Sequence, residues 1–588
     1  MGMDPDIPTP APGTPAKISS VWSWLTALAA LVGLVLLIDA SFASSATYDE
    51  VTYLKVAASW WRTGDQSEIA RMGSPLTFWK LQQAPVLWLL DRTSHGDWID
   101  DPVDHQQDLL PLVRLGSSWI WLVAFANTVC WSRHTYGPRA MTLAAWLFAL
   151  SPNLIAHGTL ATMELPLVTA TVAILWLFCR FLETNRAFWF WSAAATSGLA
   201  FSCKFTAILI PPILAIIWWI NCWQRKEYHL HVFTRHVALS MAGFVLLMML
   251  SNATLTAFAC LPLSKSHGRH PTLERWFGLS GNNIAALLYE TPLPQDWVGF
   301  ANQMHHQASG GPSYLFGQRR MTGWWYYYLV ALAVKVPLAL WLLIAARLAF
   351  SRRSRFEPAA EICNTMLPLI VFLYIGITAV GSSRNYGVRY LLPLAPLAIV
   401  WISALGEECV SYSRRSAVVA RCSVLAGIAG YVIAVAGIHP YELTYFNAFG
   451  GGSRGGRFIL ADSNLDWGQG LKCLARLQRA QSELADITFY YFGDTEPAHY
   501  GVSGASHTVN ATDDHLNLPG LYSVKTPYVA VSASLQWGAW GPPGFFNALN
   551  RVTPIRLTDD ATIAIYRTAD LNREIKAQAL SGQSGVVR

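Results

Sequence analysis

The stretch VWSWLTALAALVGLVLLIDASF, residues 21–42, is almost entirely apolar. A helix of about 20 such residues crosses the hydrocarbon core of a bilayer. Residues 1–20 before it are polar and rich in proline, so we predict a cytoplasmic tail followed by a retained membrane-spanning helix. Small residues at 43–46 imitate a signal-peptidase site, which makes a cleaved signal peptide the alternative. The apolar part of a signal peptide is shorter, however, at about 7–15 residues.

The composition of the whole chain also indicates a membrane protein. Of 588 residues, 53% are hydrophobic and 13% are charged, whereas soluble domains carry about 25% charged residues. The 26 tryptophans suit a bilayer interface. The net charge of +6 is spread over short runs between apolar segments, which argues against a nucleic-acid-binding surface. The nine cysteines form no CxxC pair, so neither a disulfide framework nor a zinc site is expected.

Further apolar segments bring the predicted number of spans to about eleven. They cover residues 112–131, 140–158, 165–182, 188–203, 205–222, 237–258, 324–349, 364–381, 390–405 and 417–438. Lys and Arg concentrate in every second connection, at 132–139, 183–187, 223–236, 350–363 and 406–416. Positive charge marks cytoplasmic loops. We therefore expect an inside N-terminus, with loops 43–111 and 259–323 and the C-terminal segment outside.

The predicted organisation is an all-α polytopic membrane domain over 21–438 and a small extracytoplasmic α/β domain over 439–588. In the latter, LKCLARLQRAQ (471–481) has helical spacing, whereas DITFYYFG (486–493), PYVAVSAS (527–534) and TIAIYRT (562–568) are strand-like. The glycine-rich segment 450–456 is a candidate hinge. In the first outer loop, the apolar spacing of 55–64 predicts an amphipathic helix lying on the membrane surface.

Ionisable residues near the membrane are the sharpest functional signal, because a charge there is costly unless it is paired, hydrated or used. Asp49 and Glu50 follow the first span, Glu164 begins the fourth, Lys204 lies between the fifth and sixth, and Lys335 lies within the eighth. The first four share the predicted outer side. For Glu50 and Lys204 the alternative is an ordinary loop carboxylate and a lysine extended to water. For Lys335 it is a structural ion pair.

The order of these parts resembles the GT-C class of membrane glycosyltransferases, and more narrowly the polyprenyl-phosphate-dependent branch with protein O-mannosyltransferases and aminoarabinose transferase. The matching stretches are TYDEVTYL (47–54), HGTLATMELPL (157–167), GLAFSCKFTAILIPP (198–212), GWWYYYLVALAVKVPL (323–338), RNYGVRYLLPLAP (384–396) and HPYELTYFNAFGGGSRGGRFILADSNLDWGQGLKCL (439–474). Two positions depart from the family pattern. A single proline, Pro85, stands where a Pro-Pro pair is common, and Glu164 stands where Asp is common.

The resemblance implies transfer of a sugar from a polyprenyl phosphate to a protein, lipid or glycan acceptor on the extracytoplasmic face of the plasma or inner membrane. A lipid phosphate is a good leaving group, so the enzyme must mainly deprotonate the acceptor, align it behind C1 and hold the phosphate. Asp49 is the candidate base, since partial desolvation raises a carboxylate pKa. Glu164 and Glu50 complete the predicted catalytic set: Glu164 orients the acceptor or supports Asp49, and Glu50 supports the turn. In-line displacement predicts inversion at C1.

Arg389 is the first candidate for holding the phosphate, because a guanidinium contacts phosphate oxygens in pairs. The alternative is an interface anchor beside Tyr390. Weaker candidates for the phosphate are Lys204, Lys80, Lys335, Arg319 and Arg384. Expected partners are the polyprenyl-phosphate-linked sugar and membrane lipids, with no nucleic acid.

No cofactor is expected, and a bound divalent metal ion is the alternative that the sequence leaves open. DSNLDWG (462–468) imitates the start of a calcium loop, but Trp467 replaces its glycine and Cys473 its bidentate glutamate. Asp466 is instead a candidate helix N-cap. The histidines at 267, 270, 305 and 306, and the His and Asp residues of 95–105, lack the helical ligand spacing of a metal site.

Two other classes of function stay open on the sequence. A transporter or lipid flippase would use the buried charges as a pathway, although such proteins usually carry internal repeats and short loops. A catalytically silent GT-C-like subunit would keep the scaffold alone.

Overall fold

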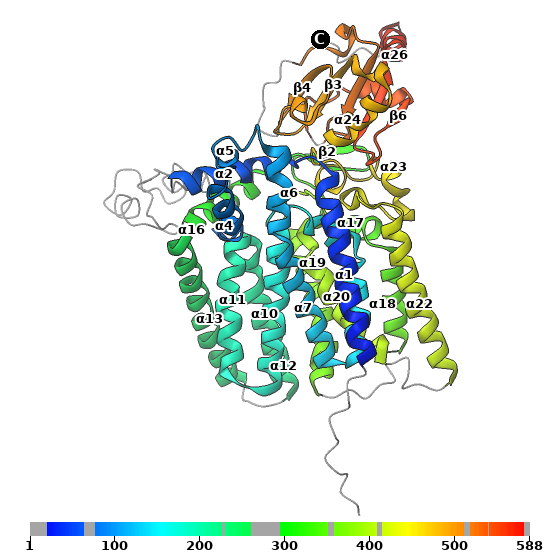
Figure 1. Ribbon diagram of the computed structural model, residues 1–588. Helices are drawn as coiled ribbons and strands as arrows, with labels where there is room; N and C mark the ends of the chain where they lie inside the picture. The colour runs from blue at the N-terminus through cyan, green and yellow to red at the C-terminus, as the bar shows by residue number, and fades with distance from the viewer. Residues whose placement is uncertain are drawn as a thin grey trace, which may run out of the picture.

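The structure, a computed structural model, describes residues 20–63, 77–225, 230–259, 295–350, 358–407, 414–510, 518–538 and 540–580. Long helices form a bundle, short helices cover one end of it, and a small sheet domain stands above that end (Figure 1). This arrangement confirms the predicted fold class, a polytopic helical membrane protein with a small C-terminal α/β region.

In the described part of the chain, seven helical segments are long and apolar enough to cross a membrane on their own. They are α1 (Ser20–Ala43), α6 with α7 (Gln106–Gly116 and Ser118–Thr135), α10 (Glu164–Thr184), η1 with α12 (Phe205–Leu209 and Ile210–Arg225), α13 (Leu230–Ala259), α19 (Pro358–Gly381) and α22 (Arg414–Ala436). Two bent helix pairs raise the number to nine at most. The two remaining predicted spans are α11 (Ala187–Cys203) and α20 (Leu394–Ser403), which stand within the bundle but have only 17 and 10 residues (Figure 1).

The predicted continuous spans 140–158 and 324–349 are wrong in detail, because each is broken by a sharp bend. The first is α8 (Pro138–Ala149) with α9 (Pro152–Gly158), bent by 62°, and the second is α17 (Tyr327–Lys335) with α18 (Leu338–Phe350), bent by 100°. A residue before proline is disfavoured in helical conformation. Ser151 and Val336, which precede Pro152 and Pro337, are accordingly extended, with ψ of 112° and 137°.

The second bend exposes backbone carbonyls that the C-terminal segment satisfies. The Asn447 side-chain nitrogen donates to the carbonyls of Ala333 (2.6 Å) and Val336 (2.8 Å), and the Asn447 amide donates to that of Val334 (2.8 Å). A helix end buried without such partners would be unstable. The bend and the C-terminal segment therefore stabilise each other.

Close packing between α1 and its neighbours requires small residues. The Trp121 ring on α7 is fully buried, and a Cβ atom added at Gly33 or Gly158 would lie 2.4 Å or 2.8 Å from it. Cores packed this tightly do not accept an extra methyl group without displacement. These two glycines let α1 and α9 approach the same indole.

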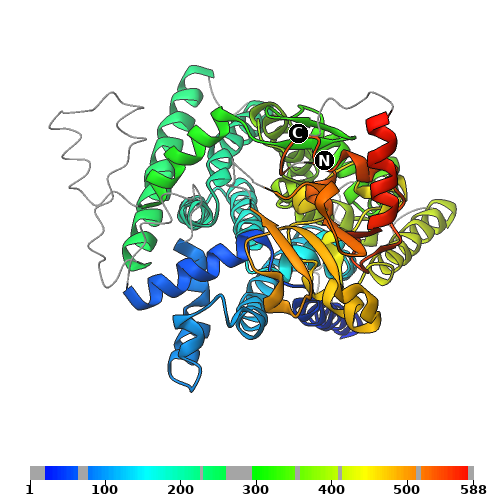
Figure 2. The same cartoon turned by 90° about the horizontal axis from the view of Figure 1, so that it is seen from above.

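The end of the bundle that bears the sheet domain carries the described parts of loops 43–111 and 259–323. It contains α2 (Tyr48–Thr63), α4 (Thr77–Asp91), α5 (Asp97–Asp100), α16 (Gln295–Ser309) and the hairpin β1 (Ser313–Leu315) and β2 (Gln318–Arg320). Helix α2 lies across the end of the bundle and contains most of the helix predicted for 55–64 (Figures 1 and 2). It begins at Tyr48, so Asp49 and Glu50 stand in its first turn, where the helix dipole favours negative charge.

The C-terminal region is built on a five-stranded sheet of order β4-β3-β5-β7-β6. The strands are β3 (Ile487–Phe492), β4 (Ala505–Val509), β5 (Tyr528–Ser532), β6 (Arg556–Leu557) and β7 (Ile563–Arg567). Strand β3 is parallel to β4 and β5, whereas β7 is antiparallel to β5 and β6. The three predicted strands are the central β3, β5 and β7, and the predicted helix is α24 (Leu471–Ala480). The two edge strands carry no clear strand pattern in the sequence, β4 because it is largely exposed and β6 because it has two residues.

The remaining elements are short helical turns that connect the helix bundle and the strands, and the C-terminal helix. They are η3 (Val388–Leu391), η4 (Glu442–Thr444), η5 (Ala448–Gly450), α23 (Gly452–Gly456), η6 (Asp462–Asn464), η7 (Ser482–Ala485), η8 (Pro497–Tyr500), η9 (Leu521–Ser523), α25 (Ala533–Gln536), η10 (Asn547–Arg551) and α26 (Thr568–Leu580). The candidate hinge at 450–456 contains α23 and the end of η5.

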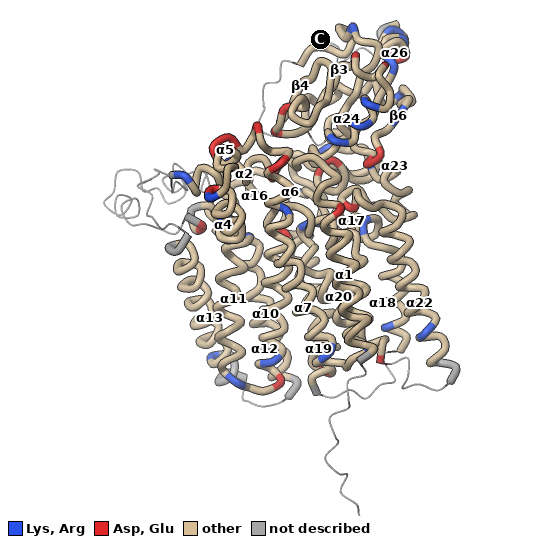
Figure 3. Tube along the Cα trace, viewed as in Figure 1, with Lys and Arg blue, Asp and Glu red and all other residues tan. Residues whose placement is uncertain are grey.

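Charged residues gather at the two ends of the helix bundle and are sparse between them (Figure 3). The end that bears the sheet domain carries most of the acidic residues (Figure 3). An integral membrane protein shows this pattern because the hydrocarbon core excludes unpaired charge.

We expect the sheet domain to lie outside the cytoplasm. A cysteine at Ser506, exposed on β4, should react with a membrane-impermeant maleimide in sealed cells. A cysteine at Ala187, exposed at the opposite end at the start of α11, should react only after permeabilisation. Both would be introduced after four native cysteines are changed to serine: Cys130 and Cys422, which are exposed, and Cys260 and Cys409, which lie in predicted loops. The reverse labelling pattern would contradict the predicted orientation.

Candidate functional site

A cavity of about 250 Å³ opens where α2, the start of α10, η1, α16 and η3 meet. Its charged lining residues are Asp49, Glu164, Lys204 and Arg389. The rest of its wall is largely apolar or aromatic and includes Tyr53, Met163, Phe205, Ile208, Leu209, Phe300, Met304, Tyr374, Ile377 and Tyr390. The cavity thus has a charged side and an apolar side.

The four charged side chains form one chain of contacts. Arg389 Nη1 lies 3.0 Å from Asp49 Oδ2 and 3.4 Å from Glu164 Oε1, and Lys204 Nζ lies 2.8 Å from the same glutamate oxygen. Asp49, Glu164 and Arg389 come from three different helices, Lys204 lies between α11 and η1, and Asp49 and Arg389 are 340 positions apart. The structure therefore brings together the predicted base, the predicted second carboxylate and two of the predicted phosphate ligands.

The two carboxylates of the site differ in their cationic partners and in their exposure to solvent. Glu164 touches both cations and is 4% exposed, whereas Asp49 touches Arg389 alone and is 26% exposed. Desolvation by the surrounding protein raises the pKa of Asp49 above its usual value, and the Arg389 charge only partly opposes this. Asp49 is thus the more open of the two carboxylates in the cavity.

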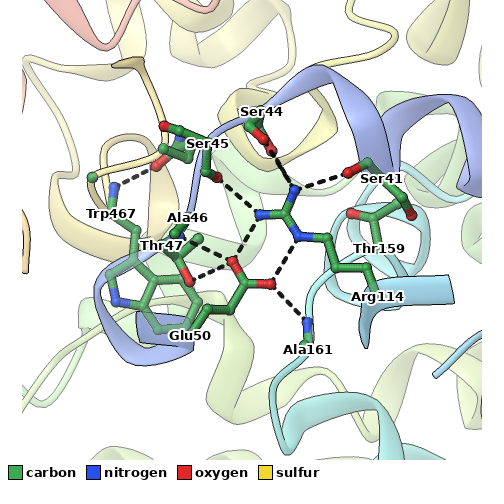
Figure 4. A network of polar contacts seen from close by, with 12 residues as sticks. Ser41, Ser44, Ser45, Ala46, Thr47, Glu50, Arg114, Thr159, Ala161 and Trp467 are labelled. Carbon is green, nitrogen blue, oxygen red and sulfur yellow. Dashed lines mark hydrogen bonds and ion pairs between the residues drawn. The ribbon is translucent and has the colours of Figure 1, made fainter. Parts of the chain in front are cut away.

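The structure places Glu50 outside the cavity, in a buried pair with Arg114 (Figure 4). Glu50 Oε2 lies 2.7 Å from Arg114 Nη2, Glu50 Oε1 lies 2.9 Å from Arg114 Nε, and both side chains are fully buried. Burial alone would raise the pKa of Glu50, but the Arg114 charge and hydrogen bonds to Thr47 and Ala161 lower it below its usual range. Glu50 is therefore a charged structural partner and makes no contact with the cavity.

The network around Glu50 and Arg114 joins four segments of the chain (Figure 4). Arg114 also donates to the carbonyls of Ser41 (3.0 Å), Ser44 (3.1 Å) and Ser45 (2.9 Å) at the end of α1. Glu50 accepts from the amides of Thr47 (3.0 Å) and Ala161 (2.8 Å). Glu50 is adjacent to Asp49, and Ala161 lies three residues before Glu164. The pair therefore fixes the backbone beneath both carboxylates of the cavity.

The other predicted phosphate ligands lie outside the cavity lining. Lys335 is buried at the α17 bend, where its Nζ donates to the carbonyls of Leu443 (2.9 Å) and Asn464 (2.6 Å). Arg319 donates to the carbonyl of Gly541 (2.8 Å), and Arg384 donates to that of Gly310 (2.7 Å). Lys80 is buried on α4 with its Nζ over the Trp60 ring, 5.7 Å from the centroid. Lys335 thus donates hydrogen bonds to backbone carbonyl groups. It is neither a lining residue of the cavity nor part of the structural ion pair given as the alternative.

The DSNLDWG segment holds the part of the chain that carries Arg389, a role that the sequence did not reveal. The Trp467 ring stacks on the Arg389 guanidinium, with 4.3 Å between guanidinium carbon and ring centroid. The Asn464 side-chain oxygen accepts from the amide of Val388 (2.9 Å), and the Trp467 carbonyl accepts from that of Tyr48 (2.8 Å). The segment therefore contacts the backbone next to both Arg389 and Asp49.

The predicted N-cap role of Asp466 is wrong. Asp466 accepts from the amides of Gly468 (3.1 Å) and Ser534 (2.8 Å), and α24 begins after Gly470 with no side-chain cap. The carboxylate instead joins the segment to the sheet domain. Burial raises its pKa to about 7. Of the second-loop histidines, positions 267 and 270 lie outside the described residues, and nowhere in the described ranges do three His, Cys, Asp or Glu side chains form a potential metal site.

The chain was compared with family models, curated proteins and solved structures. The sequence model of a family described as dolichyl-phosphate-mannose-protein mannosyltransferase matches residues 111–252. A comparison with curated proteins gives no match. Among solved structures, apo ArnT from Cupriavidus metallidurans is 12% identical, with a TM-score of 0.47 over 94% of this chain and 99% of that chain. The apo oligosaccharyltransferase of Archaeoglobus fulgidus is 12% identical, with a TM-score of 0.44 over 88% and 70%.

The family match begins in α6 and ends in α13, and it contains Arg114, Glu164 and Lys204. It covers the first membrane helices after α2 and both residues of the Lys204–Glu164 ion pair. The resemblance to mannosyltransferases of this kind, predicted from the sequence, is confirmed for residues 111–252 of this multi-pass membrane protein.

Proposed function

We propose that this protein is an inverting glycosyltransferase that moves one sugar from a polyprenyl phosphate to an acceptor on the extracytoplasmic face. The observation that carries the proposal is the meeting of Asp49, Glu164, Lys204 and Arg389 in one cavity with an apolar wall. Two cations suit a phosphate, two carboxylates suit an acceptor hydroxyl or amine, and the apolar wall suits the prenyl chain beside the phosphate.

In the proposed mechanism, the donor phosphate takes Arg389 Nη1 and Lys204 Nζ as its partners. Arg389 then no longer neutralises Asp49, so the pKa of Asp49 rises further and the carboxylate becomes a stronger base. Asp49 accepts the proton of the acceptor, the acceptor oxygen or nitrogen bonds to C1, and the C1–O bond to the phosphate breaks. Glu164 keeps its contact with Lys204 and orients the cation pair. Attack opposite to the departing phosphate inverts C1.

The match to a dolichyl-phosphate-mannose-protein mannosyltransferase model supports a lipid-phosphate sugar as donor. Sugar and acceptor are to be found by experiment. Membranes containing the protein would be incubated with radiolabelled mannose on dolichyl or undecaprenyl phosphate, and then with other sugars on the same lipids. Label that leaves the organic phase only in the presence of active protein identifies the donor. The same membranes with Asp49→Asn serve as the blank.

Arg389→Lys should lower transfer about tenfold or more, although the positive charge is kept. Lysine cannot hold two phosphate oxygens in the fixed geometry of a guanidinium, and hydrogen bonds to charged groups contribute about 1.5–3 kcal/mol each. The measurement is the initial rate of label transfer from the donor found above. Arg384→Lys is the matched control, because Arg384 lies outside the cavity lining and bonds one backbone carbonyl. Equal rates in the two variants would show that another cation holds the phosphate.

A further inference from the structure

A second cavity, of about 870 Å³, lies between the outer end of the helix bundle and the C-terminal sheet domain. Its lining comes from the residues that follow α22, from the glycine-rich segment at 451–454 with Arg457, and from the stretch 553–561 around β6. It shares no lining residue with the cavity that contains Arg389. The glycine-rich segment that the sequence suggested as a hinge is thus one wall of a separate site.

The second cavity is strongly positive. Three arginines line it, Arg454, Arg457 and Arg556, against a single acidic residue, Asp559. In the described ranges none of the three arginines has a carboxylate ion-pair partner, and the Nε atom of Arg457 is buried without a hydrogen-bond partner. Burial and the Arg454 charge lower the pKa of Arg457. The repulsion between Arg454 and Arg457, together with the buried Nε donor of Arg457, favours the binding of an anion in this cavity.

The position of this cavity is at the membrane boundary. Gly437 and Ile438 line it directly after Ala436, the last residue of the membrane helix α22. Three large apolar side chains close in sequence to the lining residues are exposed. Their exposed fractions are 71% for Ile433, 75% for Phe449 and 46% for Phe458. Exposed apolar residues next to arginines are typical of a surface that meets lipid headgroups and the upper acyl chains.

We propose that the cavity lined by Arg454, Arg457 and Arg556 binds the phosphate of an anionic lipid headgroup. In this proposal the arginine forks hold the phosphate oxygens, and the exposed rings of Phe449 and Phe458, which adjoin the lining segment in sequence, contact the acyl chains. This proposal is independent of the glycosyl transfer proposed for the first cavity. A free phosphate ion offers the same chemistry to the arginines but lacks the acyl chains, so the two sources can be separated.

The test compares charge-matched triple variants of the full chain. In R454Q/R457Q/R556Q the cavity loses its cations. In R551Q/R567Q/R573Q the sheet domain loses three arginines outside the cavity lining. Each protein is purified in detergent and titrated with phosphatidylglycerol or phosphatidylcholine, and bound lipid is measured by native mass spectrometry. We expect the cavity variant to bind phosphatidylglycerol about a hundredfold more weakly than the control variant, with no difference for phosphatidylcholine.

If the triple variant fails to fold, the single change Arg454→Gln, on an exposed side chain, should still weaken phosphatidylglycerol binding severalfold. A further arm adds inorganic phosphate at millimolar concentration. Displacement of the lipid shows that the phosphate group dominates recognition, and retention shows that the acyl chains contribute. Equal phosphatidylglycerol binding by the cavity variants and the control variant would overturn the proposal.

Discussion

Asp49→Asn should reduce sugar transfer by about 10²–10⁴-fold, the usual contribution of a general base. Asparagine keeps the size of the side chain and can still contact Arg389, which now lies 3.0 Å from the carboxylate. It cannot accept the acceptor's proton. Donor binding should survive, because the proposed phosphate ligands are Arg389 and Lys204. The measurement is single-turnover transfer together with retention of the labelled donor by the purified variant.

The matched control is Asp494→Asn. Asp494 also pairs with a cation of α2, Lys55 at 3.5 Å, but it lies outside the cavity lining. Near-normal transfer by Asp49→Asn, or a larger loss in Glu164→Gln, would move the base to another carboxylate. Failure of donor binding in Asp49→Asn would instead show that this residue mainly holds Arg389 in place.

The transfer rate of the unaltered protein should depend on pH through Asp49. A base acts when deprotonated, so transfer should fall as the pH drops through the pKa of Asp49. Because burial raises this pKa, the fall should begin at a higher pH than the ordinary aspartate value of about 3.9 would give. The acidic limb of the pH profile should be absent from the residual activity of Asp49→Asn.

Arg114→Gln should destabilise the protein by about 3–5 kcal/mol, because it leaves the Glu50 carboxylate buried without its partner. It also removes three bonds to the backbone at the end of α1. Transfer should fall as well, since the segments beneath Asp49 and Glu164 lose their common anchor. The free energy of unfolding in denaturant and the transfer rate are measured on the same preparation.

The double change Arg114→Gln with Glu50→Gln distinguishes the effect of an unpaired Glu50 charge from the effect of losing the Arg114 hydrogen bonds to the backbone. It removes the unpaired charge, so it should recover part of the lost stability relative to Arg114→Gln alone. Transfer should recover less, because neutral side chains do not restore the bonds to Ser41, Ser44 and Ser45. A control is Arg139→Gln, which breaks a partly exposed pair with Glu407 and should cost about 1 kcal/mol or less. Equal losses in Arg114→Gln and Arg139→Gln would contradict the structural role of the buried pair.

The sequence by itself determined the class of the molecule, and its nine candidate site residues include the four charged residues that line the cavity. Long apolar segments require a bilayer, and charged residues near it are costly enough to need partners, which pointed to Asp49, Glu164 and Lys204 together with Glu50 and Lys335. Arg389 was chosen separately, because a guanidinium contacts phosphate oxygens in pairs. Hydropathy depends on local composition, which a sequence displays directly. Hydropathy does not show which of the phosphate candidates lies close to Asp49. Arg389, which contacts Asp49, is 340 positions away in the sequence.

Tertiary structure alone decided which charges serve the cavity and which serve the scaffold. Glu50 is adjacent to Asp49 in sequence, yet helix geometry turns successive side chains in different directions, so Glu50 faces Arg114 and Asp49 faces Arg389. Lys335 looked like a membrane charge with a function, but the bend at Pro337 places it against backbone carbonyls of the C-terminal segment. The role of Trp467 was equally hidden, since stacking on Arg389 depends on how two distant segments pack.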